Sequence, residues 1–232
     1  MFTETLKAGW YWVARFGCQV FCALVFHIRI YGRENVPRSG AFLLAGNHQS
    51  YLDPVFCGVG VRHRLIFVAR DSLFRFKLFA WLIRSLNAIP ISRGKADIAA
   101  MKAVIARLRE GRGVCLYPEA TRTHDGRIQP IKAGFGLLCR RSQAAVVPVL
   151  IDGAFECWPR HKRFFSPGSV TVWYGKPLTP EQSRSMSNQE LADYLTRTLR
   201  RMQHDCRVKQ GKEPYTYDTD PDDMPRTDSQ NP

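Results

Sequence analysis

The sequence predicts an α/β fold, in which a central, mostly parallel or mixed sheet is flanked by helices and preceded by an apolar helical segment. Two observations lead to this prediction. Short apolar runs alternate with stretches of helical periodicity along the chain. The runs are apolar almost throughout, which is typical of strands covered on both faces. The expected strands are residues 41–45, 64–69, 88–91, 114–117, 145–151 and 170–175.

Helices are expected between these strands and after the last one. Apolar residues recur at helical spacing from Ile98 to Leu108, and Gly111 then ends the stretch. A further helix is expected over residues 180–204, with Leu191 and Leu195 on its buried side. In an open α/β sheet, ligands bind at the loops that follow the carboxyl ends of the strands. Polar residues in those loops are therefore the first candidates for function.

The chain of 232 residues has the length of one domain. We expect three parts: a membrane-associated helical segment over residues 1–30, a globular domain over residues 31–204 and a disordered polar tail over residues 205–232. The tail is rich in Asp, Pro and Thr and has no apolar periodicity. Such a composition cannot bury enough apolar surface to form a core.

The N-terminal segment is rich in Trp, Phe and Val, but Arg15, Gln19, His27 and Arg29 interrupt it. No uncharged apolar stretch reaches the length that a bilayer crossing needs, and the features of a secretory signal are missing. The aromatic residues 10–12 are typical of side chains at headgroup depth. We therefore expect a helix that lies on or dips into one leaflet, although a helix packed on the core has the same composition.

Charge is unevenly distributed along the chain. The net charge is +14, and residues 205–232 hold four bases and seven acids, so residues 1–204 carry +17. Such a surface attracts phosphate groups on nucleic acid, an anionic membrane or a phosphorylated small substrate. Bases and aromatics interleave over residues 70–84 and 158–165, which suits an anionic membrane surface. The alternative is a solvated face around core aromatics.

The seven cysteines are odd in number and never form a C-x-x-C pair. We interpret them as reduced and structural, which favours a protein that faces the cytoplasm. The histidines are dispersed, and no Cys/His group has the spacing of zinc ligands. No metal site is therefore expected.

His48 and Asp53 stand five positions apart in "AGNHQSYLDP", between an apolar run and Pro54. On a continuous helix this spacing turns the two side chains about 140° apart. They can meet only if the chain bends after the strand and Asp53 curls back from the first turn of the next helix. Pro54 supports a helix start at this point. The alternative is that Asp53 only caps that helix.

Polar side chains follow two of the expected strands. Strand 88–91 leads to Arg93, and strand 114–117 leads to Glu119, Thr121 and Arg122. An arginine at each of two strand ends suits a phosphate, because the guanidinium group pairs with two phosphate oxygens at once. Taken singly, each arginine is better explained as a solvated surface charge.

Four blocks in order, "NHQSYLD" (47–53), "AIPISR" (88–93), "YPEATRT" (117–123) and "VVPVLI" (146–151), carry a resemblance. Over about residues 31–180 the chain resembles the glycerophosphate and lysophosphatidate (1-acylglycerol-3-phosphate) acyltransferase family, so residues 31–204 are expected to be an acyltransferase domain. The chain departs from the family where Ala120 and Asn87 replace glycines that are common there. These changes leave the charged residues in place, so they affect the expected acceptor more than the expected reaction.

The resemblance implies transfer of a fatty acyl group from acyl-CoA or acyl carrier protein to the free hydroxyl of 1-acylglycerol 3-phosphate, giving phosphatidic acid. Glycerol 3-phosphate or another lysolipid is the alternative acceptor. His48 is expected to be the general base and Asp53 to orient it. Arg93 and Arg122 are expected to bind the acceptor's phosphate. Glu119 and Thr121 are expected to orient Arg122 or to contact the glycerol hydroxyl.

The acyl donor is then a co-substrate, no cofactor is expected, and the enzyme should be membrane-associated at the cytoplasmic face. Three other classes of protein remain as alternatives. A nucleic-acid-binding module would need a helix-turn-helix, RNA-binding or zinc signature, and the sequence has none, so no nucleic acid partner is expected. A hydrolase would need further acids or a G-x-S-x-G nucleophile. A silent membrane adaptor would have no use for His48, Asp53 and Arg122.

Overall fold

The computed structural model describes residues 4–91 and 98–217, and these form one seven-stranded sheet with helices on both faces. The order of the strands is β1-β7-β6-β2-β5-β3-β4, and every neighbouring pair is parallel except β6 with β7. This confirms the predicted α/β fold with its mostly parallel sheet. The strands are β1 (Arg29–Tyr31), β2 (Phe42–Gly46), β3 (Ile66–Arg70), β4 (Ala88–Ile91), β5 (Gly113–Leu116), β6 (Ala145–Asp152) and β7 (Thr171–Tyr174).

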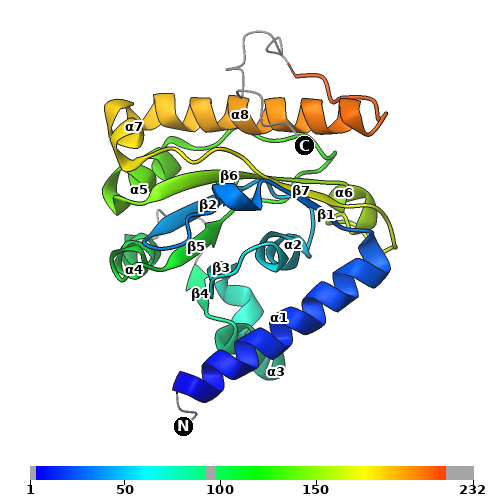
Figure 1. Cartoon of the computed structure of the whole chain (residues 1–232), viewed down its shortest axis with the longest axis horizontal. Helices are drawn as coiled ribbons and strands as arrows, with labels where there is room; N and C mark the ends of the chain where they lie inside the picture. The colour runs from blue at the N-terminus through cyan, green and yellow to red at the C-terminus, as the bar shows by residue number, and fades with distance from the viewer. Residues whose placement is uncertain (1–3, 92–97, 218–232) are drawn as a thin grey trace.

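Helices cover both faces of the sheet (Figure 1). α4, α5 and α8 pack on one face, and α1, α2 and α6 pack on the other. The α-helices are α1 (Glu4–Phe26), α2 (Asp53–Val59), α3 (Lys77–Ser85), α4 (Ile98–Arg109), α5 (Ala133–Ser142), α6 (Ala154–Cys157), α7 (Pro180–Ser185) and α8 (Asn188–Lys209), and the 3-10 helices are η1 (Arg33–Asn35) and η2 (Asp71–Arg75).

The central strands are buried on both faces, which explains their continuous apolar runs. In β2, Leu43 and Ala45 face the core under α8, whereas Phe42 and Leu44 face the core under α1 and α2. All four side chains are fully buried. Because successive side chains of a strand point to opposite faces, every position of such a strand must be apolar.

The predicted strands agree with β2 to β7 within about two residues, but β1 was missed. β1 has three residues and lies at the edge of the sheet, where its side chains are exposed or half-buried. A short edge strand carries little apolar signal, so its sequence pattern resembles that of a loop.

The predicted single helix over residues 180–204 is two helices. Thr179 begins α7 and Ser187 begins α8, each with a capping box formed with Gln182 and Glu190. In a capping box the side chain at the helix start and the side chain three residues later satisfy each other's free backbone amides, so each box starts a new helix.

The expected disorder from residue 205 is wrong for residues 205–217. α8 continues to Lys209, and the chain then folds back along it. Two tyrosines hold this return: the Arg207 guanidinium lies 4.2 Å from the ring centroid of Tyr215, and that of Arg200 lies 4.3 Å from the ring of Tyr217. These cation–π contacts order residues 210–217, although their polar composition predicted disorder. Residues 218–232 lie outside the described residues.

α1 has one packed side and one exposed side. Arg15 and Gln19 each donate to the carbonyl of Val59 at the C-terminal end of α2, both at 3.0 Å. The rest of its surface exposes large apolar side chains: Leu6, Trp12, Val13, Phe16, Val20 and Leu24. Within residues 4–91 and 98–217, no helix combines the length and the apolar character that crossing a membrane requires. All seven cysteines are free thiols.

Candidate active site

The site begins at the end of β2, where Asn47 ties the chain to β6. Its side-chain nitrogen donates to the Ile151 carbonyl at 2.9 Å, and its side-chain oxygen accepts from the Ile151 amide at 2.7 Å. Its own amide donates to Val149. Asn47 is fully buried, so these bonds are made in a setting of low dielectric constant where their loss would be costly. The next residue, His48, therefore leaves the sheet from a fixed point.

His48 and Asp53 meet across a reversal of the chain. Nδ1 of His48 lies 2.7 Å from Oδ2 of Asp53. The same oxygen accepts the backbone amides of Gln49 at 2.7 Å and Ser50 at 2.8 Å. Asp53 is the first residue of α2, and its carboxylate bonds backward to the loop, so it is not the conventional cap of its own helix. The bend expected from the spacing and from Pro54 is present.

Asp53 is completely buried, whereas the side chain of His48 is 20% exposed. With its Nδ1 hydrogen directed to the carboxylate, the imidazole has its Nε2 lone pair available. Only the histidine can be reached from solvent, and Asp53 can act only through it. This is the arrangement of a general base with a positioning group.

Tyr117, at the end of β5, supports the imidazole from one side. Its ring is stacked on His48, with the centroids 4.3 Å apart and the planes inclined by 16°. Gly46 makes room for this ring, because a Cβ at position 46 would lie 3.0 Å from Tyr117 Cε1. The stacking fixes the plane in which Nε2 can accept a proton.

Glu119 supports the backbone of His48. Its Oε1 accepts the amide of His48 at 2.7 Å, and its Oε2 accepts the amide of Gln129 at 2.9 Å. The residue is only 3% exposed. Burial raises the pKa of Glu119 to about 8, against the opposing effect of the two amides. The two oxygens of Glu119 thus bond to backbone amides of two loops, and its expected role toward Arg122 or the glycerol hydroxyl stays a prediction.

Arg122 lies beside His48 and has a free hydrogen-bonding atom. The amide of the next residue, Thr123, donates to the His48 carbonyl at 2.8 Å. The Arg122 guanidinium is stacked on Tyr51 at 3.4 Å from the ring centroid. Its Nη1 is buried and hydrogen-bonds to no described group. A buried guanidinium nitrogen in this state is prepared to bind an anion, because an anion would satisfy it.

The other two residues predicted for the acceptor differ in their status. Thr121 is half-buried in the loop after β5, next to Arg122, and its expected role stays a prediction. Arg93 lies outside the described residues, so its expected role also stays a prediction.

Both departures from the family's glycines have a conformational consequence. Ala120 has φ +61° and Asn87 has φ +64°. Glycine adopts positive φ at little cost, asparagine tolerates it, and a residue with an ordinary Cβ is strained by it. The strain therefore falls on the loop that carries Arg122, through Ala120.

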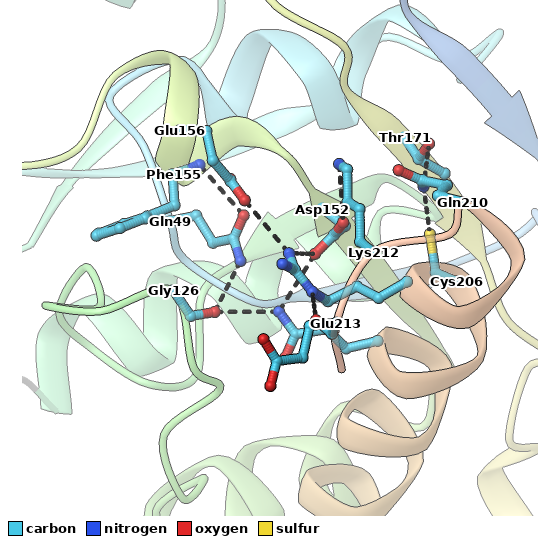
Figure 2. Close-up of polar contacts among 12 residues, drawn as sticks. Gln49, Gly126, Asp152, Phe155, Glu156, Thr171, Cys206, Gln210, Lys212 and Glu213 are labelled. Carbon is cyan, nitrogen blue, oxygen red and sulfur yellow. Dashed lines mark hydrogen bonds and ion pairs between the residues drawn. The ribbon is translucent and has the colours of Figure 1, made fainter. Parts of the chain in front are cut away.

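A network of polar contacts starts at Gln49, the residue after His48, and reaches the loop at Gly126 (Figure 2). The Gln49 side chain donates to the Gly126 carbonyl at 2.9 Å and accepts from the Phe155 amide at 3.3 Å. Gln203 of α8 donates to the same carbonyl of Gly126 at 3.0 Å and lies 3.5 Å from Asp152. The loop that follows Arg122 is thereby joined to both the His48 segment and α8.

The chain after α8 extends this network. The Tyr217 hydroxyl accepts the Ile128 amide at 2.9 Å and donates to the side-chain oxygen of Gln203. Arg200 donates to the Ile128 carbonyl from Nε and Nη2, both at 3.2 Å. Ile128 is next to Gln129, whose amide binds Glu119. The C-terminal segment thus helps to hold the loop on which Glu119 depends.

Sequence reasoning missed Tyr51, Tyr117 and Gln203. Both tyrosines lie inside quoted blocks, Tyr51 three residues after His48 and Tyr117 two residues before Glu119, and these positions were a usable signal. Gln203 gave none, because its partners are far away in sequence.

Comparisons with known proteins agree with this geometry. Residues 27–152 match the family model described as Acyltransferase, which is more than half of the chain. The chain is 25% identical over 182 residues to the 1-acyl-sn-glycerol-3-phosphate acyltransferase of Bacillus subtilis, covering 78% of this chain and 88% of that one. It is 24% identical to the chloroplast 1-acyl-sn-glycerol-3-phosphate acyltransferase LPAT1 of Arabidopsis thaliana. This match covers 77% of this chain and about half (51%) of the length of LPAT1.

Among solved structures, the fold is similar to the crystal structure of the 1-acyl-sn-glycerophosphate acyltransferase PlsC from Thermotoga maritima. The TM-score is 0.73 and the identity 24%, and the match covers 86% of this chain and 81% of that one. The family model spans the His48 reversal, the loop with Arg122 and strand β6. The motifs, the fold and this match together show that the chain belongs to the acyltransferase family. It is an acyltransferase of the 1-acylglycerol-3-phosphate type, as its four sequence blocks indicated.

Proposed function

We propose that the enzyme transfers a fatty acyl group from a thioester, acyl-CoA or acyl carrier protein, to the free hydroxyl of 1-acylglycerol 3-phosphate. The product is phosphatidic acid. The names of the relatives in Bacillus subtilis and Arabidopsis thaliana support this acceptor. The observation that carries the proposal is the His48–Asp53 pair beside an Arg122 whose Nη1 is buried with no acceptor among the described residues.

The proposed reaction needs one base and no covalent acyl-enzyme. Nε2 of His48 takes the proton of the acceptor hydroxyl as its oxygen attacks the thioester carbonyl carbon. The negative charge of Asp53 stabilises the imidazolium that forms. When the tetrahedral intermediate collapses, the carbon–sulfur bond breaks, and the imidazolium returns the proton to the departing sulfur. The products are the new ester and a free thiol.

Arg122 is proposed to bind the acceptor's phosphate. Stacking on Tyr51 holds the guanidinium plane, so little conformational entropy is lost when Nη1 meets an oxygen. The acceptor would then be attached at its anionic end while its hydroxyl reaches His48. Arg93 and Thr121 are proposed to contribute to the same pocket.

The enzyme is proposed to work at the cytoplasmic face of a membrane, where a lipid acceptor is found. The exposed apolar side of α1 supports this, and so do the exposed Phe76, Leu78 and Trp81 around α3. Aromatic and apolar side chains beside bases are typical of helices that lie in the interface. The free thiols favour the reducing side of the membrane.

The test follows thiol release from acyl-CoA, and separately from acyl carrier protein, with lysophosphatidate, glycerol 3-phosphate and other lysolipids. Lysophosphatidate should be the preferred acceptor. His48→Ala should lower the rate by about 10²–10⁴-fold, the range that general base catalysis contributes. His161→Ala, at an exposed position, is the matched control and should act as the wild type. Full activity of His48→Ala would overturn the mechanism, and preference for another acceptor would overturn the proposed substrate.

A further inference from the structure

A cavity of about 1000 Å³ lies between α1, α3 and the amino ends of β3, β4 and β5. Arg64, Asn87 and Arg112 line it, and each stands within two residues of the start of one of these strands. His48 and Glu119 follow the carboxyl ends of β2 and β5, which lie at the other end of the parallel strands. The cavity is therefore separate from the candidate active site.

The cavity is strongly basic. Its charged lining, among the described residues, consists of five bases and one acid: Arg64, Lys77, Arg84, Arg107, Arg112 and Glu110. Glu110 is already paired with Arg107, whose Nη1 lies 3.0 Å from each carboxylate oxygen. Nε of Arg64 is buried and hydrogen-bonds to no described group. The remaining positive charge is therefore available to an anionic ligand.

One wall of the cavity is aromatic and continues to the outer surface. Trp10 of α1 and Trp81 of α3 have ring centroids 6.0 Å apart, and Nε1 of Trp10 donates to Oγ of Ser85 at 2.9 Å. Trp81 is 53% exposed and its helix neighbour Leu78 is 81% exposed. Figure 1 shows α1 and α3 together at the end of the molecule remote from α8. A ligand bound here would meet charge inside the cavity and apolar surface at its mouth.

We propose that this cavity binds the phosphate headgroup of an anionic membrane phospholipid, in a site that carries out no chemistry. The phosphate is bound by Arg64 and Arg112, and the acyl chains leave along Trp10 and Trp81 into the bilayer. A tryptophan at headgroup depth and a basic pocket between helices both suit such a ligand. The bound lipid holds α1 and α3 against the membrane, so that the enzyme docks in one orientation. The inference rests on the membrane association proposed above.

The first experiment measures binding of dihexanoyl phosphatidate, a soluble phospholipid, by calorimetry. The full chain carries Arg122→Gln, which removes the proposed phosphate contact of the active site. One saturable site is expected, and adding Arg64→Gln with Arg112→Gln should weaken it at least tenfold. Lys132→Gln with Arg141→Gln, at exposed positions beside and on α5, is the matched control and should bind normally. Inorganic phosphate or coenzyme A binding as tightly as the lipid would overturn the proposal.

The second experiment measures partitioning onto vesicles that contain phosphatidylglycerol. Loss of Arg64 and Arg112 should lower partitioning about 30-fold, which corresponds to about 1 kcal/mol for each charge. Because Arg64 is half-buried, Lys77→Gln at the exposed start of α3 provides a variant that cannot disturb the core, and it should lower partitioning about fivefold. Equal losses in the control pair would overturn the proposal, because overall charge would then explain the attraction.

Turnover of a soluble lysophosphatidate separates this inference from the proposed function. The Arg64→Gln, Arg112→Gln protein with Arg122 intact should keep its thermal unfolding midpoint and its turnover while vesicle partitioning falls. A fall in turnover equal to the fall in partitioning would overturn the separate lipid site. Absence of turnover in the wild type would instead contradict the proposed acceptor.

Discussion

Asp53→Asn isolates the electrostatic contribution of the proposed catalytic pair. In the wild type a single oxygen, Oδ2, accepts from His48, Gln49 and Ser50, while Oδ1 is buried without a hydrogen bond to any described group. An asparagine can place its carbonyl oxygen at the Oδ2 position and its NH₂ group at the Oδ1 position. All three hydrogen bonds are then kept, and only the negative charge is lost.

The size of the effect follows from the geometry. An N–O distance of 2.7 Å places the centres of charge of imidazolium and carboxylate about 4 Å apart. At an effective dielectric constant of about 20, such a pair attracts by about 4 kcal/mol. The attraction is present only when His48 carries the proton, so its loss raises the barrier by that amount. The expected result is a fall in kcat of about 10³-fold with little change in KM.

The assay is thiol release from the acyl donor with saturating lysophosphatidate, in parallel with urea unfolding to confirm that the fold is intact. Asp193→Asn is the matched control, because its side chain accepts a hydrogen bond from Gln189 within α8, away from the site. A kcat for Asp53→Asn within about tenfold of the wild type would refute the reasoning, because no imidazolium would then depend on Asp53.

Three further predictions concern the supports of the site. Tyr217→Phe removes a hydrogen-bond partner of the Ile128 amide and the Gln203 oxygen, so the free energy of unfolding should fall by about 1–3 kcal/mol and KM for the acceptor should rise. Tyr194→Phe is the control. An equal loss of stability in the control would contradict the role of the C-terminal segment. Burial raises the pKa of Glu119 from 4.5 to about 8, so the folded protein keeps a proton there that the unfolded chain releases. The free energy of unfolding should therefore decrease as pH rises from about 4.5 to about 8, and urea titrations at about pH 5, 7 and 9 should show a smaller slope in Glu119→Gln; parallel curves would contradict the raised pKa. Ala120→Gly removes the strain at φ +61°, so the free energy of unfolding should increase by up to about 1 kcal/mol and the thermal unfolding midpoint should rise. A lower midpoint would show that the strain is absent.

The fold could be predicted because its strongest signals are local. The runs that became β2, β5 and β6 are apolar at every position, and that pattern has few explanations other than a strand buried on both faces. The edge strand β1 and the segment after Lys209 were not recognised, since both depend on partners far away in sequence. Arg29 of β1 pairs with Thr171, and Tyr217 with Ile128 and Gln203.

The contact between His48 and Asp53 could also be predicted. The two residues are only five positions apart across the start of a helix, and this leaves the backbone few conformations. The contacts of Glu119 could not be predicted. Its sequence position near Arg122 suggested a contact with that arginine, but its carboxyl group turns toward the amides of His48 and Gln129. Which way a buried side chain points depends on which unsatisfied groups surround it, and these come from other parts of the chain.

The sequence by itself determined the α/β class, the family and the position of the proposed catalytic pair, since each is encoded in short-range spacing of apolar and reactive residues. Only the tertiary structure decided that Tyr51 stacks on Arg122, and that α8 and residues 210–217 support the loop after Glu119. It also decided that a basic cavity opens at the amino ends of β3, β4 and β5. The physical reason is that hydrogen bonds, stacking and cavities arise between segments separated by tens of residues. Their geometry exists only once the sheet has brought those segments together.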